Sequence, residues 1–438
     1  MPSPRLRPRL RVVAAAAFAA LAPSVASAQS LLDLYDAAHA YDATYLSARA
    51  LYESAPYRVE QSRALMRPNA TLTGNASRSE FNPNTGPYFG GSANSATISA
   101  RQPIFNRSNS ATIAQSERSL VSALADLDTA EQDLMLRVSQ AYFDVLGAQD
   151  TLATTRANKA AISEQLASAK RNFEVGTATI TDTREAQARF DLATAQEIAA
   201  DNDLVTKRIA LDQLVGRSNV APRDLAVPVV LPVPTASVED YVSHAADEHP
   251  SVRRAQVAFE VAQLETEKAR AQRLPTVDAV ASVGTGRGAA YIGFPGQSAT
   301  LGVQLTLPLY TGGSVQNRIK ETLVLEERSR NDLDAARRSV VQTTRQAYYT
   351  LLSSAAQVKA LEAAEASSKL ALEATQLGYR VGIRVNVDVL NAQSQLYQTR
   401  RDLARARYDV LLATLRLRQA SGQLTPSDVV AIDRLLAR

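Results

Sequence analysis

The chain has 438 residues, with 48 Lys and Arg against 44 Asp and Glu, and no cysteine. The first 28 residues hold four of the arginines and no acid, so the rest of the chain balances 44 cations against 44 anions. This balance excludes the strongly basic surface typical of nucleic-acid binding. The missing cysteine excludes disulfides and a lipid attached through an N-terminal Cys.

Residues 1–28 have the pattern of a secretory signal peptide. Four arginines precede the apolar stretch VVAAAAFAALA at 12–22, and a small-x-small site ends at Ala28. We therefore expect the mature chain to begin at Gln29, although a disordered basic tail is the alternative. The apolar stretch is too short to span a bilayer, and no later stretch reaches about 18 apolar residues. Membrane insertion would therefore require a closed β-barrel.

The mature chain contains one pattern written twice. The decapeptide FEVGTATITD at 173–182 is matched by YRVGIRVNVD at 379–388, which begins 206 residues later. The segments QAYFDVL and QAYYTLL begin at Gln140 and Gln346, at the same spacing. Matches in the same order at one spacing indicate a tandem duplication.

The duplication divides the mature chain into two repeats that share one internal order. Each repeat is expected to contain a helix, two strands and a long helical hairpin, with hairpin tips near 173–182 and 379–391. The predicted parts are repeat 1 at 29–220, a Pro-rich linker at 221–235 and repeat 2 at 236–438, which ends in a C-terminal tail.

Four segments alternate in the manner of strands. They are expected near 69–79, 95–104, 276–285 and 298–309. In the last segment, leucines and Val303 occupy one face while Gly302, Gln304 and Thr306 occupy the other. Alternation of this kind over about ten residues is typical of a transmembrane barrel strand, with a soluble sandwich hairpin as the alternative.

The segment from 110 to 172 predicts one very long helix. It contains no proline and one glycine, and its length corresponds to about 90 Å of helix. A coiled-coil stripe with alternating spacings of four and three supports this prediction. Its members are Leu120, Leu124, Leu127, Glu131, Leu134, Val138, Ala141, Val145, Ala148 and Leu152.

Four strands cannot close a barrel by themselves, because about eight are needed. Unpaired strand edges are not tolerated in lipid, so several copies must combine. Eight strands from a dimer would leave a lumen filled by side chains, whereas twelve from a trimer can leave a passage.

The two decapeptides predict the turns of the long hairpins. Gly176 and Gly382 allow the positive φ that commonly ends a helix. Thr181 with Asp182, and the residues before Asp388, can start the returning helix.

The strand pairs, the hairpins and the decapeptides together resemble the TolC family of outer-membrane channel-tunnels over essentially the whole mature chain. The resemblance implies an α+β membrane protein in the outer membrane. It implies a homotrimer with a twelve-stranded β-barrel, four strands per chain, and a long α-helical coiled-coil tunnel in the periplasm. The implied function is a passive exit duct of a tripartite efflux pump or a type I secretion system. The implied partners are a periplasmic adaptor (membrane fusion) protein and an inner-membrane transporter.

The resemblance also implies roles for residues at the hairpin tips. Two inward-facing acidic positions at the pore constriction correspond to Asp388 and to Asn391, where the second acid is absent. A latch between neighbouring hairpins corresponds to Thr181, Asp182, Tyr379 and Arg384. The alternative is that the aspartates are solvated turn residues or helix caps.

Two other classes of protein share part of this pattern. A structural or adhesive surface protein could project a head on coiled coils without any transport channel, and a periplasmic helical scaffold would lack membrane strands. We expect no enzyme activity, cofactor or metal, because the sequence has no recognisable nucleophile arrangement or ligand cluster. The sequence leaves the cargo open between small molecules and secreted protein.

Overall fold

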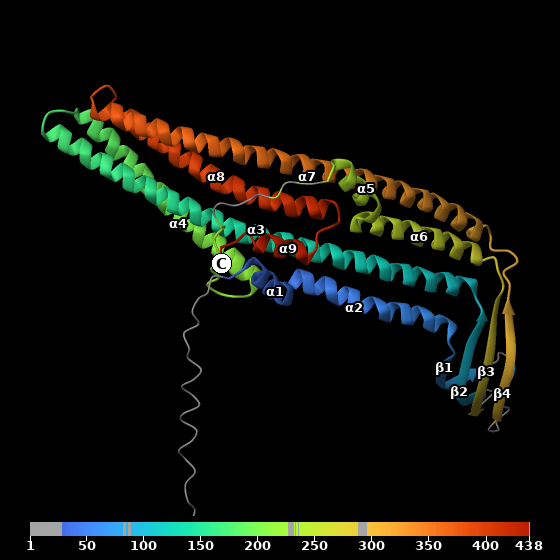
Figure 1. Cartoon of the computed structure of the whole chain (residues 1–438). Helices are drawn as coiled ribbons and strands as arrows, with labels where there is room; N and C mark the ends of the chain where they lie inside the picture. The colour runs from blue at the N-terminus through green and yellow to red at the C-terminus, as the bar shows by residue number, and fades with distance from the viewer. Residues whose placement is uncertain are drawn as a thin grey trace, which may run out of the picture.

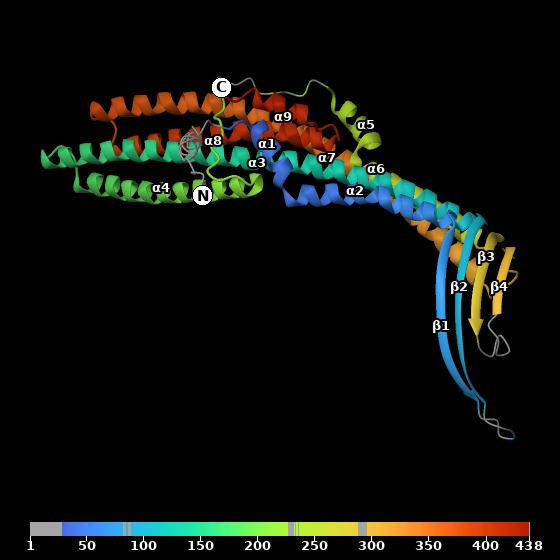
Figure 2. The ribbon, with the colours of Figure 1, turned by 90° about the horizontal axis from the view of Figure 1, so that it is seen from below.

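The structure is a computed structural model that describes residues 29–81, 85, 89–226, 232, 234, 236–287 and 296–437. The predicted signal peptide lies outside the described residues. Figure 1 shows long helices running side by side along most of the molecule, with the sheet at one end and the hairpin turns at the other. In Figure 2 the strands leave the helical part at an angle.

Each repeat supplies two shorter helices, two strands and two long helices. Repeat 1 contains α1 (Leu31–Tyr41), α2 (Ala43–Arg63), a 3-10 turn (Ala64–Met66), β1 (Asn69–Phe81), β2 (Phe89–Phe105), α3 (Arg107–Glu174) and α4 (Ile180–Val215). Repeat 2 contains α5 (Val238–Glu248), α6 (Pro250–Ala271), β3 (Thr276–Arg287), β4 (Gly296–Thr306), α7 (Ser314–Arg380) and α8 (Asn386–Ala420). A further helix, α9 (Pro426–Asp433), lies in the segment expected to be a tail.

The single helix expected before each strand pair is two helices in the structure. In repeat 1 the break falls at Asp42, whose carboxylate caps α2 by accepting from the Tyr45 N–H at 2.8 Å. In repeat 2 it falls at His249, whose Nδ1 accepts from the Ser251 N–H at 3.1 Å. The two breaks are 207 residues apart, so the duplication extends to helix caps of different chemistry.

The sheet is antiparallel in the order β1-β2-β3-β4, so β1 and β4 are its edges. β4 ends at Thr306, three residues before the predicted end of the strand, because Leu307 is followed by Pro308, which cannot donate to a ladder. Leu301, Val303 and Leu305 are 86%, 70% and 65% exposed in the single chain. An apolar strand face exposed to this extent indicates contact with lipid rather than with water.

The long helix α3 is the centre of the helical part. From Leu134 onward most of the predicted stripe is buried, whereas Leu120, Leu124 and Leu127 are half-buried. Met135, Tyr142, Phe143 and Leu146 are buried as well, although they lie outside that stripe. The buried face is wider than one coiled-coil seam because α3 packs against α4, α8, α1 and α9. Among the described residues, no helix is both long and apolar enough to cross a membrane.

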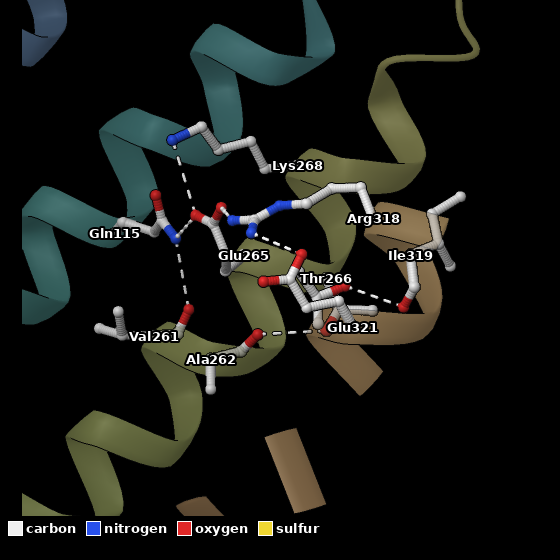
Figure 3. A network of polar contacts seen from close by, with 10 residues as sticks. Gln115, Val261, Ala262, Glu265, Thr266, Lys268, Arg318, Ile319 and Glu321 are labelled. Atoms are coloured by element: carbon white, nitrogen blue, oxygen red, sulfur yellow. Dashed lines mark hydrogen bonds and ion pairs between the residues drawn. The ribbon is translucent and has the colours of Figure 1, made fainter. Parts of the chain in front are cut away.

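A polar network joins both repeats close to the sheet (Figure 3). Glu265 of α6 accepts from the Gln115 side chain of α3 at 2.9 Å and from Arg318 of α7 at 2.8 Å. Gln115 also donates to the carbonyl oxygen of Val261 at 3.3 Å. One carboxylate therefore connects the N-terminal parts of the two longest helices, α3 and α7, close to where each helix follows its strand.

Candidate gate at the hairpin tips

The two long hairpins turn at the predicted glycines. Gly176 has φ +79° and Gly382 has φ +81°, and no other atom lies within 4 Å of where a Cβ would be. A non-glycine residue would therefore meet backbone strain rather than a clash, at a cost of about 1–2 kcal/mol. Both α3 and α7 end two residues before their glycine, so the two turns are built alike.

The returning helices begin with aspartates at equivalent positions. Thr179 is the N-cap of α4, which corrects the expectation that Thr181 starts this helix, and Asp182 accepts from the Thr179 N–H at 3.0 Å. In α8, Asp388 accepts from the Val385 N–H at 3.5 Å. Both carboxylates therefore have a capping role near a helix N-terminus, where negative charge is favourable.

Polar side chains connect the two hairpins of one chain beside these turns. The Asn172 Nδ2 donates to the Tyr379 hydroxyl at 3.2 Å. Asn386 is 2% exposed and accepts a hydrogen bond from the Gln165 side chain of α3. Its own amide donates to the carbonyl oxygen of Asp182 at 3.5 Å.

A further contact lies two turns from the tip of the second hairpin. Arg189 of α4 donates to Asn391 Oδ1 at 3.0 Å. Asn391, one of the two residues expected at the constriction, therefore contacts hairpin 1 of its own chain. The link is exposed, so water competes with it.

The four expected latch residues do not contact one another among the hydrogen bonds and ion pairs of the described chain. Arg384 lies 3.6 Å from Asp388 of its own hairpin, and Tyr379 contacts Asn172 instead of Thr181 or Asp182. The expected latch therefore remains a prediction for hairpins of adjacent copies.

Sequence reasoning did not identify four of the residues that connect the hairpins near their tips within one chain. These residues are Gln165, Asn172, Arg189 and Asn386. The available signal was Asn386, a polar residue at the start of a helix next to apolar Val385 and Val387. Its partner could not be chosen from sequence, because the partner depends on how two hairpins 200 residues apart align.

Comparisons with known proteins identify the family. The family model "Outer membrane efflux protein" matches residues 15–217 and 241–423. The outer membrane protein TolC of Vibrio cholerae is 34% identical over 415 residues, covering 93% of both chains. The alkaline protease secretion protein AprF of Pseudomonas aeruginosa is 34% identical over 346 residues, covering 76% of this chain and 70% of AprF.

Solved structures share the fold at lower identity. The outer membrane protein VceC of Vibrio cholerae has a TM-score of 0.77 at 18% identity, covering 90% of this chain and 96% of VceC. CusC has a TM-score of 0.80 at 16% identity, covering 90% and 92%. The chain therefore belongs to the outer membrane efflux protein family, and it forms one third of a trimeric channel with an outer-membrane barrel and a periplasmic helical tunnel.

Proposed function

We propose that this channel is the exit duct for an inner-membrane pump, and that the hairpin tips close its periplasmic mouth at rest. The observation that carries the proposal is the set of contacts between the two hairpins around Asn386 and Tyr379. Each contact is a single hydrogen bond, worth about 0.5–1.5 kcal/mol when neutral. Several such bonds can hold a mouth closed and still yield to a partner that binds the open state better.

The partners in this proposal are a periplasmic adaptor and an inner-membrane transporter. The matched relatives include a protease secretion protein and efflux proteins, which supports both kinds of cargo. The family gives no support to an adhesive coiled-coil protein without a channel. Crosslinking in intact cells followed by capture of this chain would identify the transporter, and a capture containing neither partner would contradict this part of the proposal.

Asp388 is proposed to line the constriction, where three copies would favour cations. The structure offers a matched control, because Asp182 lies at the equivalent capping position of repeat 1. In planar bilayers, Asp388→Ala should reduce selectivity for cations over anions, and Asp182→Ala should leave it unchanged. Equal effects of the two substitutions would mean that Asp388 is only a helix cap.

The latch between adjacent copies is tested by conductance. Arg384→Ser combined with Tyr379→Phe should raise single-channel conductance, because both donor groups are removed. Native conductance in this variant would assign closure to the contacts of Asn386 instead, because Tyr379→Phe also removes the bond from Asn172 within the chain.

A further inference from the structure

Arg58 occupies the position of α2 that corresponds to Glu265 of α6. The two helices are related by an offset of 207 residues, which also relates Pro68 to Pro275 at their C-terminal ends. Glu265 is bonded to α3 and α7, whereas Arg58 is exposed and its side chain forms no hydrogen bond or ion pair within the described part of the chain. The duplicated position therefore carries the opposite charge and has no partner in its own copy.

Glu321 occupies the position of α7 that corresponds to Gln115 of α3. These helices are related by an offset of 206, which also relates Ile113 to Ile319. Glu321 is 56% exposed and lies 3.0 Å from Arg318 of its own helix. Within the chain, Gln115 donates to its partner on α6 at 2.9 Å. The residues equivalent to that bonded pair are therefore an acid on α7 and a base on α2.

The strands determine where these two residues meet. Within the chain, α6 leads into β3, which pairs with β2, and β2 leads into α3. The edges of the sheet are β1 and β4, so closing the barrel of the trimer pairs β4 with β1 of the adjacent copy. The two strand pairs have equivalent registers, because Asn69 pairs with Arg101 and Thr276 pairs with Thr306. The α2 helix of the adjacent copy therefore lies against α7 as α6 lies against α3.

The other ion pairs between α3 and α6 have no charged equivalent between copies. Within the chain these pairs are Arg107–Glu267, Arg118–Glu260 and Asp126–Arg254. Their equivalents on α7 and on α2 of the adjacent copy are Gly313 with Glu60, Val324 with Glu53, and Asp332 with Ser47. Each of these combinations lacks a cation, so none can form an ion pair. Only the position of Glu321 and Arg58 combines opposite charges.

We infer that Glu321 of each copy forms an ion pair with Arg58 of the adjacent copy, next to the sheet. This pair extends the network of Figure 3, in which Arg318 contacts both Glu265 and Glu321. Three copies then form one continuous polar belt around the trimer, which consists of Gln115, Glu265, Arg318, Glu321 and Arg58 of each copy. The belt concerns the assembly of the trimer, and it does not depend on the proposed gate or on the cargo.

The first test reverses the two charges. Arg58→Glu and Glu321→Arg each place like charges at all three contacts between copies, whereas the two changes together restore opposite charges. At about 0.1 M salt, each single variant should lower the temperature at which the detergent-extracted trimer dissociates by a few degrees. The double variant should dissociate at a higher temperature than either single variant. At about 1 M salt the differences should shrink, because the Debye length falls from about 10 Å to about 3 Å.

Asp332→Arg is the matched control. Asp332 is an acid on the same helix and lies 3.7 Å from Arg328, so this substitution also removes a short-range ion pair within α7. Its position meets Ser47 of the adjacent copy, and the dissociation temperature should therefore stay close to the native value. A double variant no more stable than its weaker parent, or a control as unstable as Glu321→Arg, would overturn the inference.

The second test measures proximity without using charge. The chain has no cysteine, so Arg58→Cys combined with Glu321→Cys introduces the only two thiols. A short bifunctional maleimide should join copies of this variant into covalent dimers and trimers that persist on a denaturing gel. Arg58→Cys with Asp332→Cys is the control, because position 332 is 11 residues farther along α7, or about 16 Å.

Crosslinking at 332 in preference to 321, or no crosslinking between copies at 321, would show that the helices do not meet as the duplication predicts. Crosslinking at 321 supports the placement of α2 against α7 even where a charge-reversed variant fails to assemble. Native helix content by circular dichroism shows that each variant has folded.

Discussion

Substitution of Asn386 by alanine should open the periplasmic mouth. Asn386 is the residue of the tip that bonds to both helices of hairpin 1, through Gln165 and the Asp182 carbonyl, and it is 2% exposed. Asn386→Ala removes both bonds and leaves the Gln165 amide, which is half-buried, without this partner.

The magnitude follows from these two bonds. The bond to Asp182 is long, at 3.5 Å, so most of the loss comes from Gln165. A lost neutral hydrogen bond with a partly solvated partner corresponds to about 1–2 kcal/mol, or a factor of roughly 5–30 in the closed-to-open equilibrium of each chain. The three copies are separate sites, so their effects should add in free energy.

The assay is single-channel recording of purified trimers in planar bilayers. Asn386→Ala should show higher conductance or a larger open fraction than the native channel. Gln398→Ala is the matched control, because Gln398 lies on the same helix and donates to Asp402 of that helix at 3.0 Å. A correctly assembled Asn386→Ala trimer with native conductance would refute a gating role for this contact.

Three further predictions concern the strands, acid stability and maturation. Leu305→Lys should impair membrane insertion by about 2–4 kcal/mol if it lies near the midplane, whereas Gln304→Lys should be tolerated, and equal yields of folded trimer would contradict the assigned faces. Hydrogen bonds from Arg137, at 2.9 Å to each oxygen, hold the pKa of Asp42 below its usual value, so this stabilisation is present above about pH 4 and lost as pH falls through the folded-state pKa. Arg137→Ala should therefore lower the melting temperature at neutral pH, with a deficit that shrinks in acid, and a constant deficit would contradict this cause. Intact mass of the envelope protein should give Gln29 as the first residue, and a retained Arg-rich segment would disprove the predicted signal peptide.

The architecture was predictable from sequence because it depends on periodicity and repetition. Strand alternation, the uninterrupted segment from 110 to 172 and the 206-residue offset are all visible without coordinates. The break at Asp42 was not predicted, because an Asp cap inside a helical pattern resembles an ordinary surface residue. In repeat 2 the equivalent break precedes Pro250, a known helix-start signal, so that boundary could have been found.

The contacts of the candidate gate were beyond sequence reasoning for a different reason. Gly176 and Gly382 follow from local backbone geometry, which a decapeptide specifies. The bond between Gln165 and Asn386 joins residues that are 221 positions apart, and it depends on how their two helices are aligned along their axes. A shift of one helix by one turn, 5.4 Å, would give each side chain another partner, and no local sequence pattern specifies this axial alignment.

The duplication implies two kinds of seam between hairpins, one within each chain and one between adjacent copies. The residues at the two seams differ near the tips. The amide bond between Gln165 and Asn386 crosses the seam within a chain. At the equivalent positions of the seam between copies, the residues are Ala371 and Ile180, and Ile180 is 49% exposed in the single chain. Apolar contact is not directional and tolerates sliding, whereas a buried amide bond is either made or broken. The two seams therefore carry different contacts at this level, so that Asn386→Ala tests the seam within a chain and Arg384→Ser tests the latch proposed between copies.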